Sequence, residues 1–483
     1  MRLLKMLGDV EYTLLQGTDT EIKNIVIDSR KVEAGDVFIC IEGLQVDGHN
    51  YIDNALKAGA AAIIVSKDVE LSGNGTIAKV SNTRAAMSIM AGNLYNWPGR
   101  KYPLIGVTGT NGKTSSTFFL ESVLKEAGKK TGLIGTVAAR VGDIPVKTEF
   151  ATSTTPDPIE LQQIFKEMLD DGVGNVVMEV TSHALEFRKM EGLSFAVSIF
   201  TNLTRDHLDL HGTMENYARA KARLFEKSDI SIINIDDEYG KFMGDYAAGK
   251  IVTYSVNKPS DLQAVNVKYT SHGISFALKI EGELMDFEIP IPGKFTVYNA
   301  LGVIGAALNL GISPNIIQKA LKKLKGVPGR IQSIPNDKGI GVYVDYSHTP
   351  DSLKNILISV REFTSGKIIT VFGCGGDRDR EKRPIMGEIA AKLSDFSVIT
   401  SDNPRSEDPQ AIVDEVEAGV SSVAKDYIKL VDRKEAIIYA INMAKAGDSV
   451  VIAGKGHESY QIFADRTIHF DDADEAAKAL KGL

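Results

Sequence analysis

The chain has 483 residues, of which 43% are hydrophobic and 24% are charged, and its formal net charge is -8. This composition is typical of a folded protein with about two to four domains. Because 63 acidic residues outnumber 55 basic ones, a global basic surface for nucleic acid is excluded. An anionic ligand would have to be held by local basic residues and backbone N–H groups.

Cysteine usage and hydropathy indicate the compartment. The two cysteines, Cys40 and Cys374, lie far apart and predict neither a disulfide framework nor a CxxC metal site. Residues 1–15 contain no long apolar run and no small-residue cleavage site, so we expect no signal peptide. No stretch approaches the roughly 18 apolar residues that a membrane span requires. We therefore expect a cytoplasmic protein with no membrane span, and a monomer.

The first part of the chain, residues 20–98, reads as a small α/β unit. Short apolar runs alternate there with polar or helical segments and predict strands at 25–28, 36–41 and 61–66. The segment that follows, 96–103, is rich in Pro and Gly and is typical of a linker.

From residue 103 the pattern is that of a doubly wound α/β domain. Runs rich in β-branched residues predict strands at 103–108, 175–180, 197–203 and 231–236, most of them separated by helical stretches. A helix is expected to start at Lys113 and to end near Gly128. The segment 251–295 predicts a β-hairpin excursion, and residues 295–311 predict a helix.

The strand pattern restarts after the Pro/Gly-rich segment 326–332. Further strands are expected at 341–347, 368–373, 397–400 and 449–454. The predicted fold class is therefore α/β with three domains, at 1–98, 99–329 and 330–483.

Polar, glycine-rich clusters follow the ends of seven predicted strands. In open α/β sheets, ligands bind beyond the carboxyl ends of the strands. Because these clusters occur in two successive sheet domains, we expect an active site between two domains that face each other.

The sequence TGTNGKT departs from the general phosphate-loop pattern GxxxxGK[ST], because the position five residues before Gly112 is Val107. Gly109 and Gly112 nevertheless let the backbone approach an anion, and a helix N-terminus follows directly. Lys113 can reach a terminal phosphate, and the Thr114 hydroxyl can bind Mg²⁺. The alternative is a glycine-rich turn with no ligand.

Two further residues are candidates to complete a Mg²⁺ site with Thr114. Glu179 ends a predicted strand, and His207 lies in the polar segment TRDHLDLHG. Mg²⁺ prefers oxygen ligands, so His207 could equally be a hydrogen-bonded histidine of the crevice. Lys221 lies on an amphipathic helix over 217–225, where spacing alone favours a solvated lysine.

Two charged segments near the carboxyl terminus, GGDRDREKRP and SDNPRSEDP, follow consecutive predicted strands. Each alone could be a solvated loop. Together they favour a zwitterionic ligand, because arginine binds carboxylates and acidic or amide side chains bind an ammonium group. The segment GKGHE adds a glycine-rich loop and Glu458.

These motifs together resemble the Mur ligase family, the ATP-dependent amide-bond-forming ligases of peptidoglycan precursor synthesis. The resemblance covers essentially the whole chain in order, through DSRKVEAGDVF, TGTNGKT, STTPDP, EVTSHAL, YARAKARLF, GRIQ, DNPRSEDP and GKGHE. TGTNGKT is the family's own form of the phosphate loop. DNPR is similar to the motif by which some members recognise meso-diaminopimelate, where Arg405 would bind a carboxylate that lysine does not have.

The resemblance implies binding residues by position. For ATP these are Gly109, Thr110, Asn111, Gly112, Lys113, Thr114, Ser115, Asn299, Arg330, Asp345 and His348. For the UDP-muramoyl-dipeptide they are Ile27, Ser29, Leu44, Gln45, Val46, Ser153, Thr154, Thr155, Thr181 and either Arg188 or Lys189. For diaminopimelate they are Arg378, Asp402, Asn403, Pro404, Arg405, Gly454 and Glu458.

The resemblance also implies the chemistry. Lys113, Glu179, His207 and Lys221 would be catalytic, with Mg²⁺ held by Thr114, Glu179, His207 and Lys221 as a carbamate. ATP would phosphorylate the D-glutamate carboxylate of the UDP-muramoyl-dipeptide, and meso-diaminopimelate would displace the phosphate. The alternatives are a lysine-adding member, a folylpolyglutamate synthase-like ligase, or a nucleotide-dependent binding or switch protein.

Overall fold

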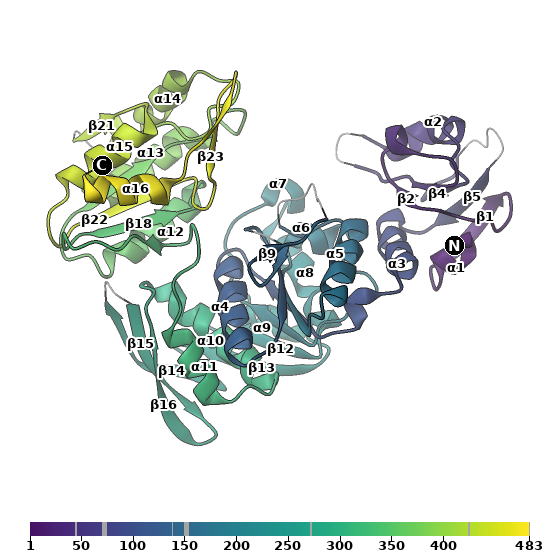
Figure 1. The fold of residues 1–483 in the computed structure, drawn as a ribbon, viewed down its shortest axis with the longest axis horizontal. Coiled ribbons are helices and arrows are strands. Elements are labelled where there is room, and N and C mark those ends of the chain that lie inside the picture. The colour runs from purple at the N-terminus through teal and green to yellow at the C-terminus, as the bar shows by residue number, and fades with distance from the viewer. Residues whose placement is uncertain are drawn as a thin grey trace. The chain divides into compact units, whose positions relative to one another are not determined.

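The computed structural model describes residues 1–43, 46–69, 75–137, 139–148, 154–270, 273–423 and 426–482. Figure 1 shows the labelled helices and strands along the chain. The chain divides into two compact units, Met1–Thr253 with Gly305–Ile312, and Tyr254–Ile304 with Ser313–Leu483. The chain passes between the units after Thr253, within β13 (Lys250–Ser255), after Ile304, within α10 (Lys294–Asn309), and again after Ile312. Strands and helices alternate in both units, which confirms the α/β fold class. The three domain boundaries stay predictions.

The first unit opens with a five-stranded sheet in the order β1-β5-β4-β3-β2. All neighbouring pairs are parallel except β1 and β5. Its elements are α1 (Leu3–Leu7), β1 (Tyr12–Gln16), β2 (Ile25–Val26), η1 (Ser29–Lys31), β3 (Val37–Ile39), η2 (Gly48–Tyr51), α2 (Ile52–Lys57), β4 (Ala62–Val65), β5 (Thr76–Val80) and α3 (Thr83–Tyr95). The three predicted strands are confirmed, each shorter than expected, whereas α1 and β1 lie outside the predicted unit.

The second sheet of this unit places its parallel strands in the order β12-β11-β6-β10-β7, with β8 and β9 added antiparallel beyond β7. The strands are β6 (Leu104–Thr108), β7 (Thr131–Ile134), β8 (Ala139–Val141), β9 (Ile144–Pro145), β10 (Asn175–Glu179), β11 (Val197–Phe200) and β12 (Ile230–Asn234). Strands β6, β10 and β11 are buried throughout, as expected for apolar strands covered on both faces.

Helices connect these strands. They are α4 (Lys113–Glu126), α5 (Pro158–Asp170), α6 (Ser182–Glu186), α7 (Leu208–His211), α8 (Met214–Ala222) and α9 (Gly240–Asp245), with short 3₁₀ turns η3 (Pro98–Arg100) and η4 (Phe225–Lys227). The predicted stop at Gly128 is confirmed, because Gly128 has φ +72° and its N–H donates to the Lys125 carbonyl at 3.0 Å.

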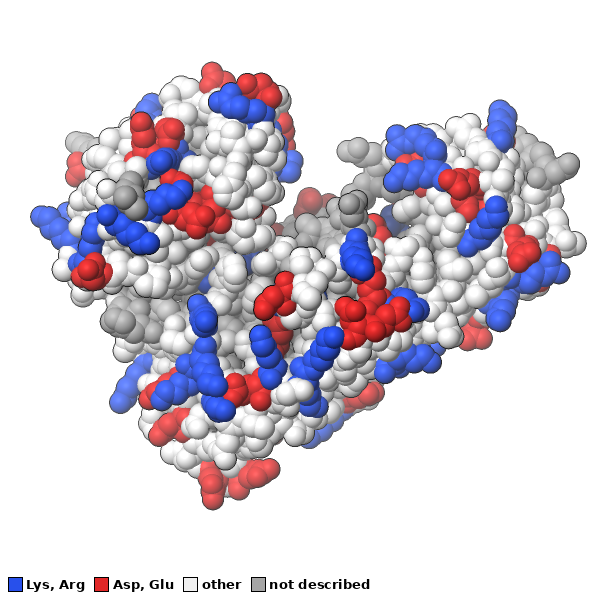
Figure 2. All heavy atoms as spheres, viewed as in Figure 1, with Lys and Arg blue, Asp and Glu red and all other residues white. Residues whose placement is uncertain are grey.

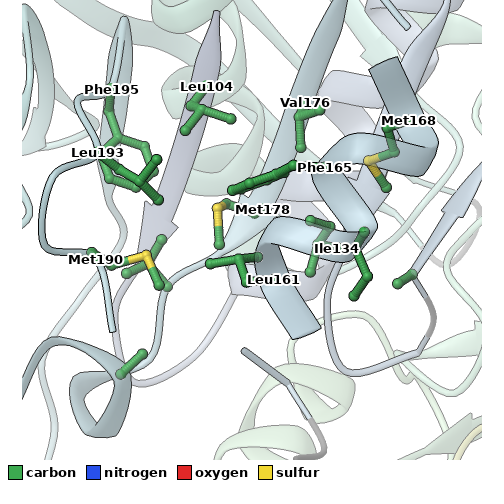
Figure 3. Close-up of a cluster of buried hydrophobic side chains, with 14 of the residues drawn as sticks. Leu104, Ile134, Leu161, Phe165, Met168, Val176, Met178, Met190, Leu193 and Phe195 are labelled. Atoms are coloured by element: carbon green, nitrogen blue, oxygen red, sulfur yellow. The ribbon is translucent and has the colours of Figure 1, made fainter. Parts of the chain in front are cut away.

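The core on one face of the central sheet fixes which strand residues face the site (Figure 3). Phe165 and Leu161 of α5 pack with Leu104 of β6 and Met178 of β10 in one buried cluster. Because successive side chains of a strand point to opposite faces, Glu179 points away from that cluster.

The second unit contains an antiparallel meander and a mostly parallel sheet. The meander, β14-β15-β16, extends the predicted hairpin excursion to three strands. The sheet runs β17-β18-β22-β19-β20-β21, and β17 alone is antiparallel. The predicted strands of this sheet, β18, β19, β20 and β22, are confirmed.

The bounds of its elements follow, together with β13 and α10, each of which lies partly in the first unit. They are β13 (Lys250–Ser255), β14 (Leu262–Thr270), β15 (Gly273–Ile280), β16 (Glu283–Ile289), α10 (Lys294–Asn309), α11 (Pro314–Lys322), β17 (Gln332–Ser333), β18 (Gly341–Asp345), α12 (Pro350–Arg361), β19 (Ile368–Phe372), α13 (Lys382–Leu393), β20 (Phe396–Ile399), α14 (Pro409–Ser421), β21 (Tyr427–Lys429), α15 (Arg433–Met443), β22 (Ser449–Ala453), β23 (Tyr460–Ile462), β24 (Thr467–His469) and α16 (Asp472–Lys481).

The distribution of charged side chains and the lengths of the helices can be compared with the sequence analysis. Acidic and basic side chains are intermingled on the face shown in Figure 2, with no single extended basic area. Among the helices in the described part of the chain, none is long and apolar enough to cross a bilayer.

Candidate active site

The phosphate loop connects β6 to α4 in the predicted strand–loop–helix arrangement. Gly109 has φ +150°, and a Cβ there would lie 1.9 Å from the Thr201 hydroxyl oxygen. Gly112, with φ +85°, is the residue before the helix. The Asn111 N–H donates to the Asn202 side-chain oxygen at 2.9 Å, which ties the loop to the segment after β11. The glycines are therefore required by conformation and by space.

Lys113 and Thr114 open helix α4, where backbone N–H groups and the positive end of the helix dipole attract an anion. The Lys113 ammonium donates to the carbonyls of Gly109 at 2.9 Å and Thr110 at 2.8 Å. Thr114 is buried, and Ser115 beside it is half-buried. This arrangement can hold a phosphate group with one cation beside it.

Glu179 ends β10 as a buried carboxylate, 1% exposed. Its two oxygens accept hydrogen bonds from the N–H and the hydroxyl of Thr136, at 2.9 and 3.2 Å. A Cβ at Gly135 would lie 2.4 Å from one of them. Within the described ranges no lysine, arginine or histidine forms an ion pair with Glu179. A buried carboxylate in this situation favours a bound cation.

His207 lies in the loop before α7 in a left-handed conformation, φ +52°. Its ring meets the ring of His183 edge-on, with 4.7 Å between centroids, and its side chain is 44% exposed. The buried part of the ring lowers the pKa of His207, and Asp206 opposes this shift. Burial, with His207 and His211 nearby, lowers the pKa of His183 to about 4. Both shifts favour the neutral imidazole, the form that binds metals.

By chemistry, the oxygens of Thr114 and Glu179 and the imidazole nitrogen of His207 fit a magnesium ion that takes its other ligands from phosphate oxygens and water. The unpaired buried carboxylate of Glu179 is the observation that supports this fit. No group of three or more His, Cys, Asp or Glu side chains in the described ranges has the arrangement of a metal site. A complete protein cage is therefore absent from those ranges, as is usual for Mg²⁺.

Lys221 on α8 is 1% exposed, so the interpretation of a solvated lysine drawn from its spacing is wrong. Amphipathic spacing does not reveal that the helix face carrying Lys221 is covered by the phosphate loop. The Lys221 amine donates to the Gly109 carbonyl at 2.9 Å. Burial first, and the nearby Lys113 second, lower the pKa of Lys221 well below its ordinary range.

Three of the residues predicted for the dipeptide lie together. The Thr155 hydroxyl lies 3.2 Å from that of Thr181, and the Lys189 amine donates to the Thr155 carbonyl at 3.1 Å and pairs with Asp157 at 2.8 Å. Arg188 pairs with its near neighbour Glu191 instead, at 3.1 Å. The structure thus groups Lys189, and not Arg188, with the threonines.

The other residues predicted for this substrate are spread along the first unit. The Thr154 hydroxyl lies 3.1 Å from that of Thr136, which also binds Glu179. Ile27 and Val46 are exposed, and Ser29 is half-buried in η1. Leu44, Gln45 and Ser153 lie outside the described residues.

The nucleotide contacts predicted in the second unit include two buried polar atoms that lack a hydrogen-bond partner in the described structure, Asn299 Nδ2 and Arg330 Nε. Such atoms are expected where a ligand binds. Asp345 ends β18, and its carboxylate accepts from the Ile331 N–H at 2.8 Å. His348 lies three residues after Asp345, with Nδ1 2.8 Å from the Tyr346 carbonyl oxygen.

Most of the residues predicted for the amino acid lie close together in the second unit. The Asn403 amide donates to Glu458 at 2.9 Å. A Cβ at Gly454, which has φ +125°, would lie 2.5 Å from the Asp402 carboxylate. Arg405 donates to the Gly376 carbonyl at 2.8 Å, next to Pro404, which is buried. Arg378, in contrast, is exposed.

Sequence reasoning missed the residues that hold this network. Lys455 is 0% exposed, and its amine donates to the Asn403 side-chain oxygen at 3.1 Å. Gln461 of β23 donates to the Asp402 carbonyl at 2.7 Å. Arg433 is fully buried, pairs with Asp472 at 2.7 Å, and donates to the carbonyls of Ser401 and Ala453. The lysine of GKGHE was visible as a motif residue, but its burial was not.

Three family models match the chain. Residues 107–307 match the Mur ligase middle domain, residues 329–456 match the glutamate ligase domain of Mur ligases, and residues 21–93 match the catalytic domain of the Mur ligase family.

Full-length relatives and a solved structure are similar to the chain. It is 48% identical to UDP-N-acetylmuramoyl-L-alanyl-D-glutamate--2,6-diaminopimelate ligase 1 of Clostridium acetobutylicum over 486 residues, covering 100% of both chains. It is also 48% identical to the UDP-N-acetylmuramoyl-L-alanyl-D-glutamate--2,6-diaminopimelate ligase of Clostridioides difficile, again over 100% of both chains. A solved 2,6-diaminopimelate ligase is 31% identical, with a TM-score of 0.72, over 100% of this chain and 99% of that one.

Proposed function

This chain belongs to the Mur ligase family of ATP-dependent amide-bond-forming ligases, and we propose that it adds meso-diaminopimelate to the D-glutamate carboxylate of UDP-N-acetylmuramoyl-L-alanyl-D-glutamate. The reaction would serve peptidoglycan precursor synthesis in the cytoplasm. The observation that supports the amino acid is the network of Asp402, Asn403, Arg405 and Glu458. It offers a guanidinium for a carboxylate and carboxylates for an ammonium group.

The first step activates a carboxylate, which by itself is a poor electrophile. An oxygen of the D-glutamate carboxylate attacks the γ-phosphorus of ATP, and the bond from the γ-phosphorus to the β-phosphate oxygen breaks. ADP departs, and the substrate becomes an acyl phosphate. Lys113 is placed to neutralise charge on the transferred phosphoryl group, and the glycines of the loop let backbone N–H groups approach it. A bound Mg²⁺ would supply further charge neutralisation between the phosphates.

The second step forms the amide. The neutral amine of diaminopimelate attacks the acyl carbon, the tetrahedral intermediate loses a proton and collapses, and inorganic phosphate leaves with the former carboxylate oxygen. Asn403 and Glu458 would orient the amino acid, and Arg405 would bind its distal carboxylate. Catalysis would thus consist mainly of positioning and charge neutralisation.

Lys221 is proposed to act as a carbamate. Because its lowered pKa leaves more of the amine neutral, the amine can attack the carbon of CO₂ and lose a proton to form an anion. This anion would replace a buried cation beside Gly109 with a ligand suited to Mg²⁺.

Lys189 is proposed to contact the dipeptide, since it lies with Thr155 and Thr181. The segment 328–332 is proposed as a hinge of the domain that carries the amino-acid residues.

The test is whether release of phosphate from ATP requires both the UDP-muramoyl-dipeptide and diaminopimelate. Amide formation and ADP release should disappear together in Lys113→Ala. Phosphate release that needs no amino acid would favour a nucleotide switch instead. Unchanged turnover in Lys113→Ala would remove that residue from the mechanism.

A further inference from the structure

Tyr217 on α8 contacts three residues of the proposed ATP and metal site, and also the neighbouring His211. Its side chain is fully buried, and its hydroxyl oxygen lies 3.1 Å from Oγ1 of Thr110 in the phosphate loop. Its ring stacks on His211 with 5.1 Å between centroids and meets His207 edge-on at 6.1 Å. The Lys221 amine lies 4.7 Å from the ring centroid.

The other hydrogen bonds of Thr110 indicate whether its hydroxyl or that of Tyr217 is the donor between them. Thr110 Oγ1 accepts from the Thr204 N–H at 3.0 Å and lies 3.2 Å from the Thr204 carbonyl, to which it can donate. A hydroxyl has one proton, so the remaining lone pair of Thr110 is free to accept from Tyr217. Within the described ranges the Tyr217 hydroxyl has no other hydrogen-bond partner, and a buried donor is rarely left unpaired. Tyr217 therefore donates to Thr110.

Helix α8 thus holds two consecutive residues of the phosphate loop. Tyr217 and Lys221 are four residues apart and lie on the same helix face. Lys221 donates to the Gly109 carbonyl at 2.9 Å, and Tyr217 binds the side chain of Thr110. The Tyr217 ring contacts Lys221 and His207, so one side chain touches both the loop and groups expected around the metal.

We propose that Tyr217 is a positioning residue for the nucleotide site: its hydroxyl fixes the phosphate loop in its binding conformation, and its ring holds Lys221 beside the same loop. The inference rests on the proposed function, because it takes the loop as the ATP site and Lys221 as a catalytic residue. A loop that is already fixed loses less conformational freedom when the nucleotide binds, so affinity is higher.

Tyr217→Phe tests the hydroxyl, because phenylalanine keeps the ring and its packing. The affinity for MgADP, measured by calorimetry, should fall roughly three- to tenfold, the effect of one net hydrogen bond. The KM for ATP should rise by a similar factor while the KM for diaminopimelate stays unchanged. Thr110→Val also removes the two bonds to Thr204, so it should lose at least as much affinity, and the double variant should be no worse than Thr110→Val alone.

Tyr102→Phe is the matched control, since Tyr102 is also buried in this unit and donates one hydrogen bond, to the Phe165 carbonyl at 3.1 Å. It should lower the melting temperature about as much as Tyr217→Phe and leave MgADP affinity unchanged. Wild-type MgADP affinity in Tyr217→Phe, additive losses in the double variant, or an equal loss of affinity in the control would each overturn the assignment. If the wild-type protein binds MgADP but forms no amide, the proposed function fails, and the affinity comparison still decides the role of Tyr217.

Discussion

Replacing Lys455 by Met removes a buried cation from the centre of the amino-acid network. The amine donates to Asn403 Oδ1 at 3.1 Å and lies 3.4 Å from a Glu458 carboxylate oxygen. Asn403 Oδ1 keeps one other donor, the Ile462 N–H at 3.0 Å, and Asn403 still donates to Glu458 at 2.9 Å. The side chain of Met is nearly as long as that of Lys, so the substitution removes the charge and leaves the buried volume almost unchanged.

The expected effect follows from these contacts. A hydrogen bond to a charged group contributes about 1.5–3 kcal/mol, and part of this remains because Asn403 and Glu458 stay bonded to each other. Burial lowers the pKa of Lys455, and the nearby carboxylate of Asp402 opposes that shift. We expect the KM for diaminopimelate to rise about 10- to 100-fold, since about 1.4 kcal/mol corresponds to a factor of ten. The KM for ATP should stay unchanged, because the amine bonds to Asn403 and Glu458.

The assay is steady-state phosphate release with each substrate varied in turn, accompanied by a melting curve. Lys429→Met is the matched control, because Lys429 pairs with Asp414 and Glu417 at the surface of the same unit. An unchanged KM for diaminopimelate in a folded Lys455→Met protein would refute the role of Lys455. A rise of equal size in the control would do the same.

Three other predictions follow from the structure. Lys221→Ala should lose most activity and regain part of it with added short carboxylic acids, measured as phosphate release; full activity without additives would contradict a carbamate. Lys189→Ala should raise the KM for the UDP-muramoyl-dipeptide about tenfold, the effect of one charged hydrogen bond, and Arg188→Ala by much less; the reverse order in initial-rate assays would show that Arg188 is the contact. A hydrogen bond from the buried Arg383, followed by one from the Asp377 N–H, lowers the pKa of Glu407 from 4.5 to about 2, so this carboxylate stabilises the fold above pH 4.5 and loses that effect as the pH falls toward 2. Glu407→Gln should therefore melt below the wild type at neutral pH, with a difference that shrinks in acid; a difference independent of pH would refute this account.

Local patterns were sufficient to predict strands such as β6, β10 and β11 and the strand–loop–helix form of the phosphate loop, but they missed β5 and β7. Strands such as β6 and β10 are continuous apolar runs because both of their faces are buried, and the turn between β6 and α4 needs glycines that are visible in the sequence. The short elements α1 and β1 carry weaker signals, since five-residue segments give little periodicity.

Contacts between distant residues were beyond the sequence. Arg433 and Asp472 are separated by 39 residues, and nothing in their local spacing indicates that they form a buried pair under the amino-acid network. Lys221 has the spacing of a surface lysine, yet the loop at Gly109, 112 residues earlier, covers it. Its catalytic role was implied by family resemblance alone, and its burial became visible only in the structure.

The most direct test of the central claim is the identity of the amino acid in the product. The protein is incubated with ATP, Mg²⁺, the UDP-muramoyl-dipeptide and an equal mixture of meso-diaminopimelate and lysine, and the products are resolved by mass spectrometry. Because Arg405 is expected to bind a carboxylate that lysine does not have, the account predicts a product that carries diaminopimelate almost exclusively. A product that carries lysine, or no amide product at all, would contradict it.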